Sequence, residues 1–97
     1  MKTLHEIRSI LSAHVDELRD RYGITNIAVF GSVVRGEARE DSDVDILADF
    51  PLNIGLFELC SAENHLCDLL GMDVDLVPRN AVRSELQEQI LGEAIAV

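Results

Sequence analysis

The chain has 97 residues, of which 47% are hydrophobic, and 18 acidic side chains against 8 Lys and Arg give a net charge of −10. This length fits one globular domain over residues 1–97. The charge argues against direct binding of nucleic acid or of an anionic membrane, because both rely on Lys and Arg. It is compatible with a metal site and with a basic protein partner.

The hydrophobic pattern predicts alternating helices and strands. Apolar residues spaced three and four apart predict an amphipathic helix over residues 3–21, which Gly23 ends. A β-branched and apolar run predicts a strand over 24–30, which Gly31 breaks. The later expected elements are a short helix over 32–36, a polar loop over 37–42, a strand over 43–50, a helix over 56–70, a strand over 73–77, a helix over 81–91 and a tail over 95–97. This order predicts an α/β or α+β domain in which about four helices pack on a three-stranded sheet.

Cys60 and Cys67 lie on one expected helix, seven positions apart. They are separated by roughly 10 Å at 1.5 Å per residue, which exceeds the usual disulfide reach of about 7 Å between Cα atoms. We therefore expect reduced thiols in a cytoplasmic protein. No apolar run approaches membrane-spanning length, and the charged N-terminus has a helical pattern rather than that of a signal peptide.

A glycine-serine turn follows the first expected strand. Gly31 permits a close approach of the backbone to a phosphate group. Ser32 is able to cap the next helix or to donate to a phosphate oxygen, and the helix start adds free N–H groups. A Gly-Ser pair alone is most often a plain turn, so its meaning depends on what lies nearby.

Asp43 and Asp45 alternate along the second expected strand, so both side chains point to the same side. Aspartate is poor in strands, and metal ligation would explain this pair better than an Asx turn and a solvated edge. If the strand over 73–77 pairs beside it, Asp75 joins them in an open Mg²⁺ site. Asp73 is a competing third ligand on the same face. Asp75 lies deeper in the apolar run, where we expect it to be buried.

The combination of these motifs resembles the DNA polymerase β-like nucleotidyltransferase superfamily, and more narrowly the minimal nucleotidyltransferases (MNT) of prokaryotes. Asp43 follows Ser32 by eleven positions, and the resemblance covers about residues 20–97. The matching segments are Phe30-Gly31-Ser32-Val33-Val34-Arg35-Gly36, Ser42-Asp43-Val44-Asp45-Ile46-Leu47, Phe50, Gly55-Leu56-Phe57-Glu58-Leu59, Leu69-Leu70-Gly71 and Val74-Asp75-Leu76-Val77.

The resemblance implies a small mixed sheet and nucleotidyl transfer from ATP with two Mg²⁺ ions. Asp43 and Asp45 would hold both ions, and Gly31 and Ser32 would hold the β- and γ-phosphates. Asp75, rather than Asp73, would ligate the metal that activates the acceptor hydroxyl, or would serve as its base. Arg35 and Ser42 also match family positions. Arg35 is equally suited to a phosphate contact and to a salt bridge with Glu37, Glu40 or Asp41.

The resemblance also implies a partner. Minimal nucleotidyltransferases are often the antitoxin half of a two-gene module whose toxin is a small helical HEPN protein. Such an enzyme moves AMP from ATP onto a tyrosine of the toxin, a reaction called AMPylation. We also expect acceptor recognition to come from a partner, because this chain is too short for a further acceptor-binding domain. Two alternatives remain: an antitoxin that masks its toxin by binding alone, and the catalytic subunit of a two-chain transferase with a small-molecule acceptor.

Overall fold

A mixed sheet forms the centre of the computed structural model, which describes residues 2–97. Its four strands lie in the order β3-β2-β1-β4. β1 pairs antiparallel with β2 and with β4, whereas β2 and β3 are parallel. The strands are β1 (Thr25–Phe30), β2 (Val44–Asp49), β3 (Val74–Pro78) and β4 (Ile95–Ala96). The sequence indicated three strands and missed β4.

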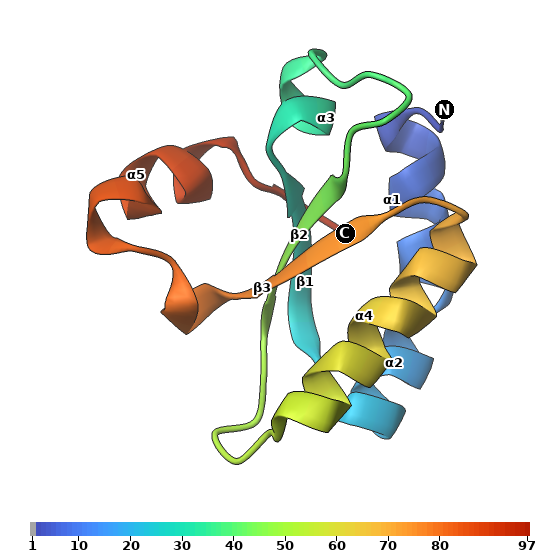
Figure 1. Cartoon of the computed structure of the whole chain (residues 1–97), viewed down its shortest axis with the longest axis vertical. Helices are drawn as coiled ribbons and strands as arrows, with labels where there is room; N and C mark the ends of the chain where they lie inside the picture. Colours follow the sequence, from blue (N-terminus) through green and yellow to red (C-terminus); the bar gives the residue numbers. More distant parts are fainter. Residues whose placement is uncertain (1) are drawn as a thin grey trace.

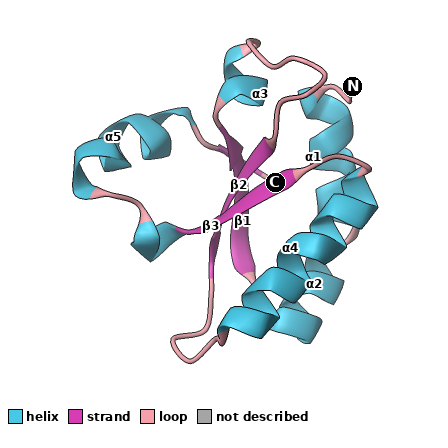
Figure 2. Ribbon diagram, in the orientation of Figure 1, coloured by secondary structure: helices cyan, strands magenta, loops and turns pink. Residues whose placement is uncertain are grey.

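Five α-helices surround the sheet, as Figures 1 and 2 show. They are α1 (Leu4–Ala13), α2 (Val15–Tyr22), α3 (Ser32–Arg35), α4 (Leu56–Leu70) and α5 (Ser84–Glu93), and a 3₁₀ turn η1 (Arg79–Ala81) precedes α5. The α+β class is confirmed. The helix expected over 3–21 is divided at His14, whose backbone leaves the helical region with φ −116° and ψ 9°. The imidazole Nδ1 of His14 lies 2.8 Å from the Ile10 carbonyl oxygen.

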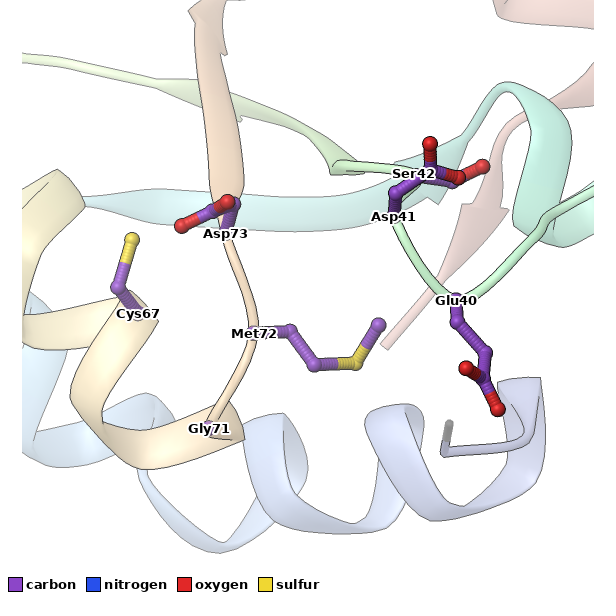
Figure 3. A pocket seen from close by; sticks show the side chains of 7 residues that line it. All are labelled: Glu40, Asp41, Ser42, Cys67, Gly71, Met72 and Asp73. Carbon is purple, nitrogen blue, oxygen red and sulfur yellow. The ribbon is translucent and has the colours of Figure 1, made fainter.

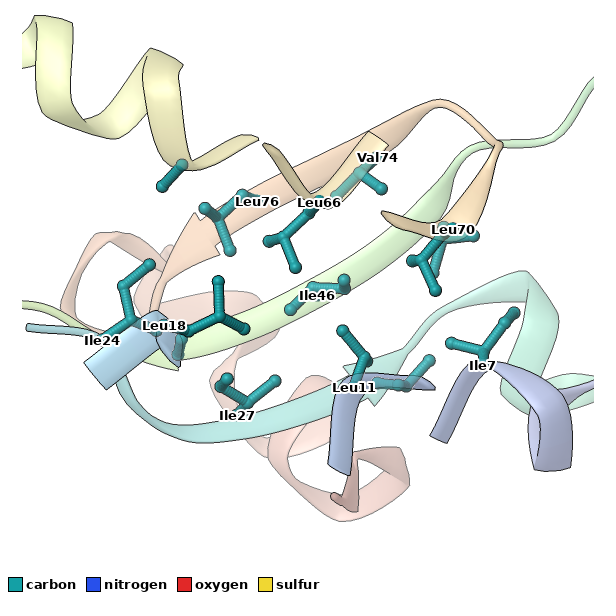
Figure 4. Close-up of a cluster of buried hydrophobic side chains, with 14 of the residues drawn as sticks. Ile7, Leu11, Leu18, Ile24, Ile27, Ile46, Leu66, Leu70, Val74 and Leu76 are labelled. Atoms are coloured by element: carbon teal, nitrogen blue, oxygen red, sulfur yellow. The ribbon is translucent and has the colours of Figure 1, made fainter. Parts of the chain in front are cut away.

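The main hydrophobic core lies between α1, α2 and α4 and one face of the sheet (Figure 4). Ile7, Leu11 and Leu18 contribute from the first two helices, and Leu66 and Leu70 from α4, all with at most 1% exposure. A capping box between Thr3 and Glu6 satisfies backbone N–H groups at the start of α1. The buried strand residues of this layer are Ile27, Val29, Val44, Ile46, Ala48, Val74 and Leu76.

A smaller cluster covers the opposite face of the sheet. Ala28, Phe30 and Leu47 pack there with Val82, and Ile90 of α5 adds a partly buried contact. Because strand residues alternate between faces, Asp45 and Asp75 belong to this thinly covered face. Asp43, which the sequence placed inside the strand, directly precedes β2. The fold therefore directs the apolar neighbours of Asp45 and Asp75 into the main core and leaves these two carboxylates on the less covered face.

β4 exists because the tail finds a partner at the edge of β1. Ala28 pairs with Ala96 and Val29 with Ile95, and the Val97 N–H donates to the Ile27 carbonyl at 3.0 Å. A strand of two residues is too short to show an alternating pattern, so the sequence could not predict it.

Within residues 2–97, no helix has both the length and the apolarity needed to cross a bilayer. Cys60 and Cys67 are free thiols.

Candidate active site

Asp45 is the central residue of the candidate site. It pairs with Phe30 across the antiparallel β1–β2 ladder and with Asp75 across the parallel β2–β3 ladder. Gly31 directly follows Phe30, so the glycine turn and Asp75 lie on opposite sides of Asp45. Three segments that are distant in sequence are thereby brought to one end of the sheet. This is the convergence that the sequence predicted.

Gly31 lets the turn approach Asp45. Its φ of 80° and ψ of −152° belong to a region that only glycine adopts readily. A Cβ atom built on Gly31 would lie 2.9 Å from the Asp45 Cγ and still closer to a carboxylate oxygen. The backbone conformation and the close approach both exclude a side chain here.

The carboxylates of the site influence one another. Burial raises the pKa of Asp45 to about 6, helped by the charges of Asp75 and then Asp43, while Arg35 opposes the shift and Glu93 adds to it. Partial desolvation, then the Glu63 and Asp43 charges, likewise raises the pKa of Asp75. These shifts mean that the acids lie close together with too little positive charge around them.

Asp75 is exposed, which corrects the expectation that it would be buried in its apolar run. β3 is an edge strand, so Val74 and Leu76 are buried on one face while Asp75 on the other remains open. The N–H of Leu76, at the edge of β3, donates to the Glu63 Oε2 at 3.0 Å. Glu63 of α4 thus holds the strand that carries Asp75.

Asp73 belongs to a neighbouring cleft rather than to β3, which begins at Val74. Its backbone carbonyl accepts the Val44 N–H at 2.9 Å, so it fixes the start of the β2–β3 pair. The cleft has a volume of about 530 Å³, and Figure 3 shows Met72 extending toward Glu40 within it. Its lining residues are Glu40, Asp41, Ser42, Cys67, Gly71, Met72 and Asp73.

The two predicted serines have different settings. Ser32 is the half-buried first residue of α3, and Gly31, which has no side chain, occupies the N-cap position, so Ser32 is not the cap that the sequence considered. Ser42 closes the loop before β2, because its Oγ accepts the Arg39 N–H at 2.8 Å. Ser42 lines the cleft described above.

Arg35 forms salt bridges with Glu37 and Glu93. Of the three acids considered from the sequence, Glu37 is the one that pairs with it. The Glu93 pairing was missed, because 58 residues separate the two side chains and Glu93 lies at the end of α5. The Glu93 Oε1 also accepts the Gly31 N–H at 3.0 Å. Neither Glu93 nor Glu63 carries a local sequence signal.

The side chains of the site determine whether a metal ion fits there. Within residues 2–97, no three His, Cys, Asp or Glu side chains are gathered into a ready metal cage. Mg²⁺, however, is usually bound by one or two carboxylates together with water and substrate phosphates. Carboxylates whose pKa values are raised by burial and by neighbouring negative charges are the donor set that such a cation would relieve. The residues therefore fit Mg²⁺ that arrives with phosphate ligands.

Comparison with known proteins defines the class. Residues 11–97 match the family model described as "Nucleotidyltransferase domain". The chain belongs to this family and is a nucleotidyltransferase.

Individual relatives show which members of the family the chain is similar to. The chain is 50% identical over 97 residues to the protein adenylyltransferase MntA of Thermococcus cleftensis, with 100% of this chain and 98% of the relative covered. A solved candidate minimal nucleotidyltransferase matches with a TM-score of 0.82 and 41% identity, covering 99% and 97% of the two chains. A complex of tri-AMPylated Shewanella oneidensis HEPN toxin with MNT antitoxin matches with a TM-score of 0.68 and 21% identity, covering 93% and 70%. At that identity the last likeness concerns the fold alone.

Proposed function

We propose that this chain transfers AMP from ATP to a hydroxyl group, a tyrosine, on a partner HEPN toxin, and thereby acts as its antitoxin. The observation that carries the proposal is the position of Asp45 between the Gly31 turn and Asp75. The 50% identity to a protein adenylyltransferase over the whole chain supports the choice of AMP as the transferred group. The similarity in fold to the MNT antitoxin in complex with tri-AMPylated HEPN toxin supports the choice of acceptor.

The residues divide the work of an in-line displacement. The acceptor oxygen attacks the α-phosphorus of ATP, the bond from this phosphorus to the bridging oxygen of the β-phosphate breaks, and pyrophosphate leaves. Gly31, Ser32, Arg35 and Ser42 bind phosphate oxygens through N–H, hydroxyl and guanidinium groups. Two Mg²⁺ ions, when bound, would stabilise the attacking and leaving oxygens.

Asp43, Asp45 and Asp75 would be the ligands of those ions. Alternatively, Asp75 is not a metal ligand but the base for the acceptor hydroxyl, because its raised pKa makes it a better proton acceptor than an ordinary aspartate. Its exposure on the edge strand gives an acceptor from another molecule a path to it. This opening suits a protein acceptor that presents a side chain to the sheet.

The net charge of the chain supports a protein as its partner. A net charge of −10 favours association with a basic surface and disfavours nucleic acid as a direct ligand. We place the reaction in the prokaryotic cytoplasm, where ATP and a newly made toxin are both present. The described residues act as one catalytic domain in this proposal.

The decisive experiment is incubation of the chain with ATP, Mg²⁺ and the HEPN protein, followed by intact-mass and peptide mass spectrometry. We expect one or more AMP units on a tyrosine of the partner, absent with Asp45→Asn. Asp68→Asn is the matched control, because Asp68 is an exposed acid on α4 away from the sheet face that carries the site. If the Asp43→Asn/Asp45→Asn double variant neutralises the partner equally well and no adduct forms, neutralisation occurs by binding alone and the proposal is wrong.

A further inference from the structure

The Glu93 carboxylate accepts hydrogen bonds from the same N–H groups that the proposed function assigns to a phosphate of ATP. The Glu93 Oε1 accepts the Gly31 N–H at 3.0 Å. The Arg35 Nη1 donates to both Glu93 oxygens, at 3.0 and 3.2 Å. The Glu93 side chain is 17% exposed, so this is a partly desolvated contact rather than a transient surface pair.

This arrangement imitates a bound anion. A backbone N–H together with a guanidinium fork is a common way to bind a phosphate oxygen. Glu93 presents two oxygens and one negative charge to the same donors. A triphosphate oxygen and the Glu93 carboxylate cannot satisfy the Gly31 N–H and the Arg35 Nη1 at the same time.

We propose that Glu93 is a specificity-determining residue that occupies the triphosphate site of the free enzyme and is displaced when the metal-bound nucleotide enters. The inference rests on the proposed function, since it takes Gly31 and Arg35 as phosphate contacts. Glu93 therefore competes with every anion for this site.

The helix that carries Glu93 is lightly held. α5 contributes no fully buried residue, and its first turn lacks a side-chain cap. Leu86 and Leu91 are 41% and 49% exposed, and Figure 1 shows α5 standing apart from the other helices. A segment with few buried apolar contacts opens at low cost. Withdrawal of Glu93 therefore requires only a small rearrangement at the end of α5.

Competition by Glu93 favours one form of the substrate. Its charge adds to those of Asp43, Asp45 and Asp75 around the site, so a free polyphosphate meets strong repulsion. A nucleotide that brings Mg²⁺ supplies the positive charge that compensates these acids. Glu93 thus excludes metal-free phosphates and polyphosphates from the Gly31–Arg35 position.

The test uses inorganic tripolyphosphate in EDTA, with binding measured by calorimetry and by the shift of the Gly31 amide resonance. Glu93→Gln and Glu93→Ala should each bind tripolyphosphate about tenfold more tightly than the unmodified chain. Glu37→Gln is the matched control, because Glu37 pairs with Arg35 without touching Gly31, and it should raise the affinity far less than the Glu93 variants. Arg35→Ala combined with Glu93→Gln should remove the gain.

The outcomes separate this inference from the proposed function. Unchanged or weaker binding in both Glu93 variants would overturn the inference and make Glu93 a residue that only positions Arg35. An equal gain in Glu37→Gln would also overturn it, because the effect would then be one of general charge. A gain in binding cannot come from a poorly folded variant. AMP transfer by the unmodified chain is measured separately, so either claim can fail without the other.

Discussion

Asp45 and Asp75 are direct neighbours across the parallel β2–β3 pair, and their side chains share the sheet face opposite the main core. One carboxylate is half-buried and the other is exposed on the edge strand. The strand pairing fixes the separation of their backbones, so the charge of Asp75 contributes to the raised pKa of Asp45 at all times. The folded protein keeps this repulsion between the two carboxylates, although the repulsion lowers the stability of the folded state.

Asp45→Asn should therefore stabilise the metal-free protein. Folding raises the pKa of Asp45 from an ordinary 3.8 to about 6, so the folded state holds this proton more tightly than the unfolded state. The ionised carboxylate consequently destabilises the fold, by an amount that is absent below about pH 4, grows up to about pH 6 and is complete above it. The variant should gain on the order of 1–3 kcal/mol at pH 7.

Urea unfolding in EDTA, at several pH values from 4 to 8, measures this gain as a difference from the unmodified chain. The difference should be small at the acidic end and reach its plateau above about pH 6. Asp73→Asn serves as the control, since it removes a carboxylate that is exposed and outside β3. A constant difference across this pH range would contradict the assignment of the repulsion to Asp45.

Gly31→Ala should slow transfer severely, whereas Gly36→Ala should be tolerated. Both glycines have positive φ, 80° and 73°, but only Gly31 has a neighbour that a Cβ would strike. Gly36 has open space around it, so alanine there should cost only about 1–2 kcal/mol of stability. Displacement of Asp45 in Gly31→Ala should reduce the single-turnover rate more than about 100-fold. Equal loss of rate in the two variants would mean that the close approach of Gly31 to Asp45 is unimportant.

The sequence predicted the residues whose roles depend on local pattern. Gly31, Asp43 and Asp45 occur within one short segment, and strand alternation is enough to place Asp45 on the face opposite Val44 and Ile46. Asp43 was expected in the same strand but directly precedes it, because β2 begins at Val44. Asp75 followed from the assumption that two apolar strands pair side by side, which the β2–β3 register confirms.

Other features depended on contacts that no local pattern encodes. Glu93 reaches Gly31 across 62 residues, and Glu63 reaches Leu76 from the middle of a helix. The break at His14 was hidden because Leu11, Val15 and Leu18 continue the helical spacing through it and no proline or glycine marks it. The exposure of Asp75 depends on β3 being the edge strand, which is a property of the strand order.

Asp75→Asn and Asp73→Asn should separate the roles of these neighbouring acids. Asp75 is aligned with Asp45, so its loss should lower the single-turnover rate about 100-fold or more, with a smaller effect on ATP affinity. Asp73 contributes its backbone carbonyl to the β2–β3 pair, which Asn retains, so the rate should change little. A severe loss in Asp73→Asn with a near-normal rate in Asp75→Asn would reverse the assignment.

Removal of Mg²⁺ should weaken ATP binding strongly. The site presents the Asp43, Asp45 and Asp75 carboxylates to an anionic ligand, so ATP in EDTA should bind at least about tenfold less tightly than ATP with Mg²⁺. Asp43→Asn/Asp45→Asn should reduce this dependence on metal, because the repulsion and the ligands are lost together. Calorimetry with and without EDTA gives both affinities. Equal affinities for the unmodified chain would show that these acids do not hold the metal.

The most direct test of the central claim uses ATP labelled in either the α- or the γ-phosphate, with Mg²⁺ and the HEPN partner, and measures the label retained on the partner. If Asp45, Asp75 and the Gly31 turn carry out nucleotidyl transfer, the α-label is retained, the γ-label leaves with pyrophosphate, and Asp45→Asn transfers neither. Retention of the γ-label, or equal α-labelling by Asp45→Asn, would contradict the account.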